Sequence, residues 1–154
     1  MIAASGDVII HALDPASGET RWTAPRAQPP RGSGLTTPPD VDSRGLTSDA
    51  VRIYASSSTG AVVALSPADG TQLWASPANL SALFDLRTDG ESVFAVHFFG
   101  PLGVLDAATG AVRWAYDGTR FAAVPGERFT GTAAFDTANL YVNGAKGYYA
   151  FRKK

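Results

Sequence analysis

The chain has 154 residues, of which 45% are hydrophobic and 18% charged, so it has the composition of a folded domain and not of a disordered protein. Thirteen basic and fourteen acidic side chains give a formal charge of −1, and a nucleic-acid partner, which would normally meet a basic surface, is not expected. The absence of cysteine excludes disulfides, thiolate metal sites and a cysteine nucleophile.

Two stretches bear on a possible relation to a membrane. Residues 1–7 contain no basic region and no long apolar segment, so no signal peptide is recognised there. The longest apolar stretch, 93–105, is interrupted by His97, Gly100 and Pro101 and is too short to cross a bilayer. We therefore expect no membrane span, while the compartment of the protein stays open.

Short β-rich segments separated by turn residues follow one another along the chain, and no segment has the periodicity of a helix. The expected strands include residues 1–4, 8–13, 19–24, 51–55, 93–98 and 140–142. The chain is therefore predicted to be all-β.

A motif Asp/Ser-x-x-x-Gly-x-x-x-Trp occurs three times without gaps. Its copies consist of Asp14, Gly18 and Trp22, of Ser66, Gly70 and Trp74, and of Asp106, Gly110 and Trp114. We expect the Asp or Ser side chain to cap backbone amides of a tight turn in which glycine takes a positive φ. The tryptophan recurs at one position of the next strand, so it is expected to pack between neighbouring repeats and not to bind a ligand.

The spacing of the motif indicates the architecture. The tryptophans lie 52 and 40 residues apart, and a period near forty fits a four-stranded propeller blade. We predict one domain, 1–154, that is a partial β-propeller of four-stranded antiparallel blades. The predicted blade segments are approximately 1–25, 35–77, 79–117 and 128–154. The longer first interval predicts an insertion loop at 26–48, rich in proline and glycine, which is either a binding loop or a neutral insertion.

The repeated pattern resembles that of the pyrroloquinoline-quinone-like, or quinoprotein-type, β-propellers, with about three and a half blades present. That family includes quinoprotein alcohol dehydrogenases, the propeller lipoprotein of the outer-membrane barrel assembly machine, and sensor domains of bacterial kinases. The resemblance implies a bacterial repeat protein, often extracytoplasmic. The dehydrogenases look like longer chains with adjacent cysteines over the quinone and a bound calcium ion. Because this chain is short and lacks cysteine, no cofactor is expected.

The two ends of the chain also suggest how a ring would close. Residues 147–152 align with the strand before each turn, with Arg152 at the Asp position, and the resemblance implies that the N-terminus completes such a last blade. No strand is expected before residues 1–4, so the first blade lacks its innermost strand. We expect either a missing N-terminal half or a homodimer that closes the ring, and favour the first.

Three further features are candidates for a site. His97, Phe98 and Phe99 form a candidate surface for stacking or for a partner, with strand core followed by a turn as the alternative. Residues 40–45 weakly resemble a calcium loop, but oxygen ligands are missing from it, so no metal site is expected. The two histidines have no paired nucleophile motif, and no catalytic residue is assigned.

The function expected from these observations is a non-enzymatic propeller domain, or the C-terminal part of one, that serves as a protein-interaction or ligand-binding scaffold. A fragment of a quinone-dependent dehydrogenase is an alternative, which calcium-dependent binding of the quinone would favour. A sensor domain of a bacterial signalling protein is another, which a kinase or membrane span encoded upstream would favour. The identity of the partner or ligand does not follow from the sequence.

Overall fold

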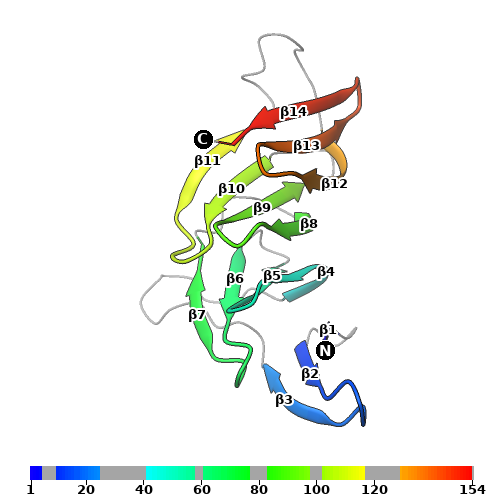
Figure 1. Cartoon of the computed structure of the whole chain (residues 1–154), viewed down its shortest axis with the longest axis vertical. Helices are drawn as coiled ribbons and strands as arrows, with labels where there is room; N and C mark the ends of the chain where they lie inside the picture. The colour runs from blue at the N-terminus through cyan, green and yellow to red at the C-terminus, as the bar shows by residue number, and fades with distance from the viewer. Residues whose placement is uncertain are drawn as a thin grey trace.

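The computed structural model describes residues 1–4, 10–24, 41–57, 61–76, 83–97, 102–116 and 129–153. Fourteen β-strands lie in these residues (Figure 1). They are β1 (Ile2–Ala4), β2 (Ile10–Leu13), β3 (Thr20–Ala24), β4 (Val41–Ser48), β5 (Ile53–Ser57), β6 (Val62–Leu65), β7 (Gln72–Ala75), β8 (Leu83–Thr88), β9 (Ser92–His97), β10 (Leu102–Asp106), β11 (Val112–Tyr116), β12 (Phe129–Phe135), β13 (Asn139–Gly144) and β14 (Tyr148–Arg152). The described part contains no helix, and so none that would be long and apolar enough to cross a membrane.

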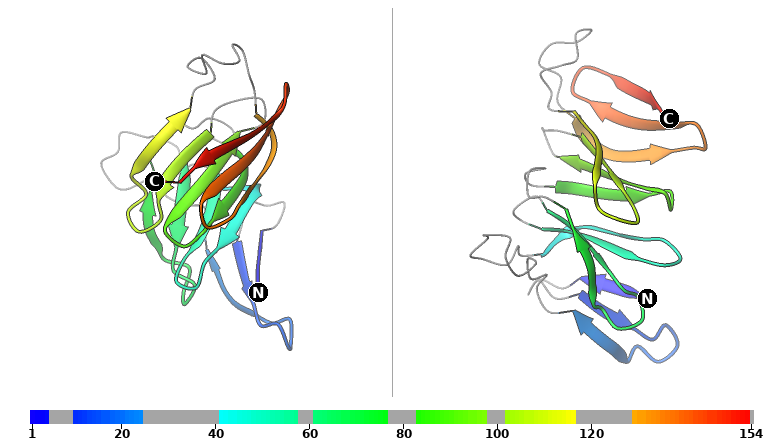
Figure 2. Two further views of the ribbon diagram at one scale, coloured as in Figure 1. Left: turned by 45° about the horizontal axis from the view of Figure 1, so that its top comes forward. Right: turned by 90° about the vertical axis from the view of Figure 1, so that its left-hand side faces the viewer.

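The strands form four antiparallel sheets, in which strands consecutive in the sequence are neighbours. Their orders are β1-β2-β3, β4-β5-β6-β7, β8-β9-β10-β11 and β12-β13-β14, and we call these sheets blades 1 to 4. Figure 2 shows the blades following one another along the long axis of the molecule, from the N-terminus to the C-terminus. The all-β class and the four-stranded antiparallel blades predicted from the sequence are thus confirmed.

One register is repeated in all four blades. Residues directly opposite each other on neighbouring strands form the rows Ile2–Ala12–Trp22, Tyr54–Ala64–Trp74, Phe94–Val104–Trp114 and Tyr141–Ala150. Because cross-strand partners lie on the same face of a sheet, each row belongs to one face of its blade. In blades 1 to 3 this face is turned toward the next blade, since each row contributes to the core that follows it.

The hydrophobic core is divided into three clusters that each join two consecutive blades. Ile10 of blade 1 packs with Val63 of blade 2, Tyr54 of blade 2 with Leu105 of blade 3, and Phe94 of blade 3 with Phe129 of blade 4. The first strands of blades 2 to 4 also contact one another, β4 against β8 and β8 against β12. A single blade cannot bury both of its faces, so the stack is held together by these shared interfaces.

Residues 41–48 fall both in the predicted insertion loop 26–48 and in the predicted blade segment 35–77, and the structure corrects the loop in favour of the blade. They form β4 and pair with β5, with a register shift in the middle of the strand. The strand is mostly polar and has no apolar alternation, so its sequence resembles a loop. At Gly45 the backbone comes so close to Ser56 that a Cβ would overlap the serine side chain, which explains the glycine. The remainder of the predicted loop, 26–40, lies outside the described residues.

Candidate functional site

The three copies of the repeated motif form turns between the last two strands of blades 1 to 3, which we call the outer turns (14–18, 66–70 and 106–110). In the first, the Ala16 amide donates to Asp14 Oδ1 at 2.8 Å, and in the third the Ala108 amide donates to Asp106 Oδ1 at 3.0 Å. In the second, Ser66 Oγ accepts a longer bond from Ala68, at 3.3 Å. The motif glycines have φ values of 73 to 75°, a left-handed conformation that favours glycine.

Two of the outer turns also contain an ion pair. Asp14 binds Arg21, and Asp106 binds Arg113, in each case with 2.5 Å between an arginine nitrogen and Oδ2. The arginine lowers the pKa of Asp14, and likewise that of Asp106, to about 2, and hydrogen bonds from the turn add to the effect. In the second turn Ser66 and Leu73 stand at these two positions, so this pair is absent there.

The tryptophans of blades 1 and 2 lie on the outer turn of the next blade. Trp22 Nε1 donates to the Pro67 carbonyl oxygen at 3.0 Å, and Trp74 Nε1 donates to that of Ala107 at 3.1 Å. The indole of Trp22 covers Gly70, where a Cβ would lie 2.7 Å from the ring, and Trp74 covers Gly110 in the same way. These two rings therefore connect blades.

A second repeated turn was missed in the sequence. It joins the first two strands of blades 2 to 4, and we call its copies the inner turns (49–52, 89–92 and 136–139). Each begins with an aspartate whose Oδ1 accepts two backbone amides of the turn. An aromatic residue follows five positions later, and the pairs are Asp49 with Tyr54, Asp89 with Phe94 and Asp136 with Tyr141. The signal Asp-x-x-x-Ile/Val/Leu-Tyr/Phe was present, but it lies outside the more conspicuous tryptophan motif.

In two inner turns a tyrosine hydroxyl donates a hydrogen bond to Oδ2, the second carboxylate oxygen of the aspartate. Tyr54 donates to Asp49 Oδ2 at 2.6 Å, and Tyr141 donates to Asp136 Oδ2 at 2.7 Å. Burial, followed by the bond to Asp49, raises the pKa of Tyr54 to about 12. The Tyr141 hydroxyl, helped by turn amides, lowers the pKa of Asp136 to about 2.

Blade 3 has phenylalanine at the tyrosine position, and a lysine from blade 4 replaces the missing hydroxyl. Lys153 Nζ donates to Asp89 Oδ2 at 2.6 Å and lies over the rings of Phe94 and Phe135, 5.6 and 4.6 Å from their centroids. Burial alone would raise the pKa of Asp89, but the bonds from Lys153 and the turn amides lower it overall. In the strand register, Arg152 of blade 4 is equivalent to Asp106 of blade 3. The next residue, Lys153, is therefore equivalent to Ala107 of blade 3 and Pro67 of blade 2.

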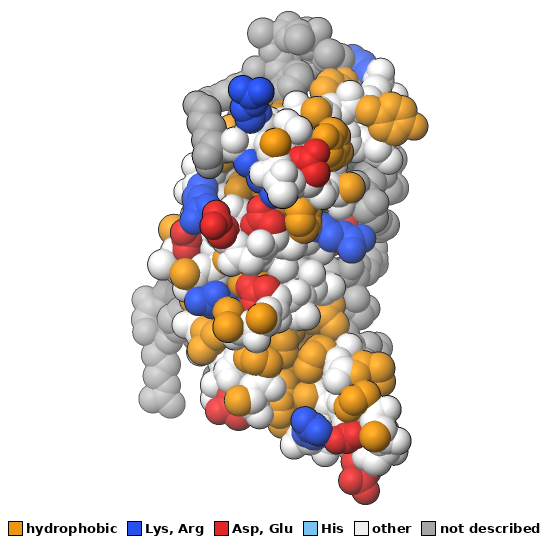
Figure 3. Space-filling model, viewed as in Figure 1, with side chains coloured by type: hydrophobic (Ala, Val, Ile, Leu, Met, Phe, Trp, Pro, Cys, Tyr) orange, Lys and Arg blue, Asp and Glu red, His pale blue; other side chains and the backbone are white. Residues whose placement is uncertain are grey.

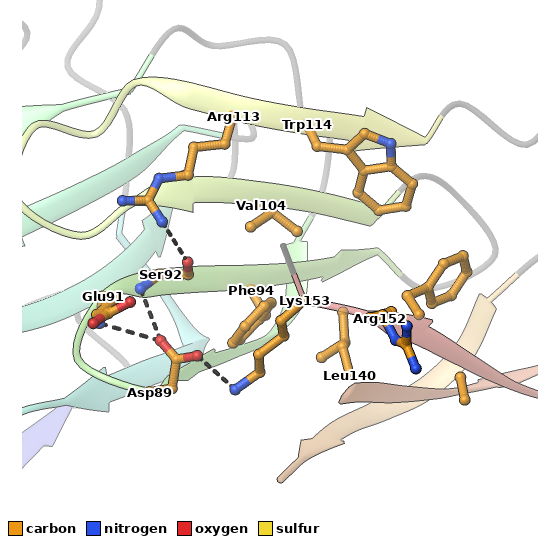
Figure 4. Close-up of a pocket in the computed structure, with 12 residues that line it drawn as sticks. Asp89, Glu91, Ser92, Phe94, Val104, Arg113, Trp114, Leu140, Arg152 and Lys153 are labelled. Carbon is orange, nitrogen blue, oxygen red and sulfur yellow. Dashed lines mark hydrogen bonds and ion pairs between the residues drawn. The ribbon is translucent and has the colours of Figure 1, made fainter. Parts of the chain in front are cut away.

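A pocket of about 670 Å³ lies beside this ion pair, between blades 3 and 4 (Figure 4). Its apolar walls are formed by Phe94, Val104, Trp114, Leu140, Ala150 and Phe151. Its polar walls are formed by Asp89, Glu91, Ser92, Arg113, Arg152 and Lys153. Trp114 is the most exposed of the three tryptophans, at 40%, and the centroid of its ring lies 5.4 Å from that of Phe151. The pocket therefore combines apolar and aromatic walls with charged groups.

The remaining predicted features lie elsewhere or outside the described residues. His97 ends β9, but its side chain and the residues Phe98 and Phe99 are not described. In the described ranges no three His, Asp or Glu side chains are grouped to hold a metal ion. Figure 3 shows positive and negative side chains interspersed over the face seen there, without a large area of one sign among the described residues.

Comparison with known proteins agrees with the repeated geometry. The chain aligns over 99% of its length with BamB from Moraxella catarrhalis, at 20% identity and a TM-score of 0.69, and covers 41% of that chain. It covers 42% of the designed Ika8 protein (18% identity, TM-score 0.73) and 83% of the designed Ika4 protein (16% identity, TM-score 0.72). The chain thus spans less than half the length of the first two of these structures.

Other comparisons differ in what they show. Quinohemoprotein alcohol dehydrogenase from Comamonas testosteroni matches 70% of the chain at 16% identity and a TM-score of 0.55, which is a likeness of fold. No curated protein sequence matches the chain. The family model described as outer membrane protein assembly factor BamB matches residues 5–153, nearly the whole sequence. The chain therefore belongs to this BamB family of pyrroloquinoline-quinone-like propeller repeats.

Proposed function

We propose that the chain is a non-enzymatic propeller domain, or part of one, that binds another protein on a rigid scaffold. The observation that carries the proposal is the pocket between blades 3 and 4, which lies next to β14, the last strand of a three-stranded blade. The description of the family as an assembly factor also suggests protein partners. No cofactor is part of the proposal.

The way the blades are joined supports a scaffold. Consecutive blades share buried clusters, and the indoles of Trp22 and Trp74 hydrogen-bond the next blade. Such repeated interfaces hold surface groups at fixed distances, so a partner meets a preformed surface and little ordering is needed when it binds. The likeness to the alcohol dehydrogenase is a likeness of fold and adds no specific observation for the enzymatic alternative.

Site-specific photo-crosslinking in bacterial cells that express the chain tests the proposal. A photoreactive amino acid replaces Ala150, which lines the pocket and is exposed, and in a matched control it replaces Asp69, an exposed residue of the second outer turn. We expect a discrete protein adduct at position 150 and none at position 69. Adducts at neither position, or equal yields at both, would contradict a protein-binding role for the pocket.

A further inference from the structure

One asparagine of the chain stands in a sequence that favours a reaction with its own backbone. In this reaction the nitrogen of the following residue attacks the side-chain carbonyl carbon, and a following glycine leaves that nitrogen unhindered because it has no side chain. The chain contains three asparagines, and only Asn143 precedes a glycine, Gly144. Both residues lie at the end of β13, next to the tight hairpin that leads to β14 (Figure 1).

The surroundings of Asn143 leave its side chain open to this reaction. Asn143 is exposed, and no hydrogen bond of its amide is seen among the described residues. Asn139, at the other end of the same strand, differs in both respects. Its Nδ2 donates to the Tyr141 hydroxyl at 3.3 Å, and the residue that follows it, Leu140, is branched and buried. Asn139 is therefore a natural internal control.

Aspartate before glycine can close the same ring, but the described pairs of this kind are protected. Asp69 and Asp89 each precede a glycine. Ring closure requires a neutral carboxyl group, whereas the Ser66 hydroxyl and the turn lower the pKa of Asp69. At Asp89 burial opposes such a shift, but Lys153 and the turn amides still lower the pKa overall. Both carboxyl groups are thus ionised at neutral pH, while the amide of Asn143 needs no protonation.

The hairpin holds the attacking nitrogen in place. The Gly144 amide donates to the Gly147 carbonyl oxygen at 2.7 Å, and Asn143 is paired with Tyr148. The nitrogen has to lose its proton before it attacks, so the ring can close only while these two pairs at the end of the hairpin are open. The preceding residue, Val142, is 2% exposed and belongs to the core between blades 3 and 4. An opening that stops before Val142 leaves that core intact.

We infer that Asn143 is a site of spontaneous deamidation, and that opening of the β13–β14 hairpin sets its rate. In the open hairpin the Gly144 nitrogen gives its proton to the solvent and bonds to Cγ of Asn143, and the side-chain nitrogen takes up a proton and leaves as ammonia. One water molecule then opens the five-membered imide at either of its carbonyl groups. The products are aspartate and isoaspartate, and no oxidant or reductant takes part.

The isoaspartate product changes the strand as well as the charge. Its main chain runs through the former side chain and is one methylene longer, so the end of β13 loses its register with β14. The reaction therefore adds a negative charge and loosens the hairpin at one step. This inference is independent of the proposed binding role.

Mass spectrometry of proteolytic peptides tests the inference. The folded chain is incubated at mildly alkaline pH beside the end-blocked peptide Tyr-Val-Asn-Gly-Ala-Lys, which has the sequence of residues 141–146. We expect conversion at Asn143 and none at Asn139. The folded chain should react about ten to a hundred times more slowly than the peptide, which corresponds to an opening free energy of about 1.4 to 2.8 kcal/mol. No product at Asn143 after about a hundred half-lives of the peptide, or equal conversion of both asparagines, would overturn the inference.

Hydrogen exchange measures the same opening by a second rate. Exchange and deamidation both require the Gly144 amide to be free of Gly147, so both should be slowed relative to the peptide by factors that agree within about threefold. A Gly144 amide that exchanges as fast as in the peptide, while deamidation is strongly slowed, would show that the hairpin is not the gate.

Two variants identify the reacting groups. Asn143→Gln keeps an amide but would need a larger ring, so it should stay unmodified. Gly144→Ala should react more slowly than the parent chain, because the methyl group hinders the nitrogen; the φ of Gly144 is not positive, so alanine fits its backbone. Circular dichroism checks the β spectrum of both, and the comparison of the parent chain with the peptide needs neither. The same mass change at an unaltered rate in Asn143→Gln would place the reaction at another residue and refute the inference.

Discussion

The interface between blades 2 and 3 and that between blades 3 and 4 are built on one register but are completed differently. In the first, Trp74 and Tyr54 pack together, with ring centroids 5.8 Å apart, and both lie against the Ala107 carbonyl oxygen, at 3.1 and 3.4 Å. In the second, Trp114 and Phe94 stand at the same positions, yet a pocket adjoins them. Among the described residues, the same arrangement therefore meets an outer turn at the first interface and adjoins a pocket at the second.

At the second interface a lysine supplies the hydrogen bond that a tyrosine supplies at the first. Phe94 cannot donate to Asp89, and without another donor that carboxylate would be left half-satisfied. Lys153 reaches it from blade 4 and at the same time covers the apolar ring of Phe94. The open interface therefore keeps a polar contact between blades while Trp114 stays accessible.

Replacing the tryptophan at each interface should give the largest difference in stability between the two interfaces. We expect Trp74→Ala to lower the free energy of unfolding by about 3 to 5 kcal/mol, because a packed ring and its hydrogen bond are lost. Trp114→Ala should cost about 1 kcal/mol, since that residue is 40% exposed and covers no glycine of a turn within the described residues. Urea unfolding followed by circular dichroism measures both, and equal losses would show that the two interfaces are not different.

The motif glycines provide a matched pair for the same comparison. Gly110→Ala should cost about 2 to 4 kcal/mol, because it adds a left-handed alanine and a clash with Trp74. Gly18→Ala has the same φ but nothing within 4 Å of the new Cβ, so only the backbone strain of about 1 kcal/mol is expected. Thermal unfolding of both variants gives the difference. A Gly18→Ala variant as unstable as Gly110→Ala would mean that the indole contact contributes nothing.

The sequence predicted the parts of this comparison that are local, and missed those that depend on distant residues. The spacing from Asp or Ser to Trp was enough to predict the blades and the order of their strands, since each motif lies in one continuous stretch of the sequence. β4 was missed because its polar sequence has no strand pattern of its own, and only its pairing with β5 shows it to be a strand. The inner turns were missed because their sequence signal is short. The pocket was missed because it depends on Lys153 reaching Asp89, 64 positions earlier in the chain.

Exchange of the two aromatic residues at the inner turns tests the role of the hydroxyl. Tyr54→Phe should lower the free energy of unfolding by about 1 to 2 kcal/mol, because the second oxygen of Asp49 loses its donor in a partly buried position. Phe94→Tyr should change stability by less than about 1 kcal/mol, since the new hydroxyl would only compete with Lys153 for Asp89. Urea unfolding measures both variants. A loss in Phe94→Tyr as large as in Tyr54→Phe would show that the two turns do not share one geometry.

Removal of the lysine amine is expected to have a small effect on stability and a distinct dependence on pH. Lys153→Met should cost about 1 kcal/mol at neutral pH, through the ion pair and the contact with two rings. It should also raise the pKa of Asp89, which can be followed by NMR titration, because burial would then act without its main opposing group.

The sign of the pH effect follows from the direction of that shift. In the folded protein the pKa of Asp89 lies below its ordinary value of 3.8. The stability it contributes is therefore present above pH 4 or so and is lost as the pH falls through the folded-state value. The difference between the parent chain and Lys153→Met should accordingly shrink below about pH 4, while a difference that stays constant down to about pH 2 would show that Lys153 acts through its ring contacts alone.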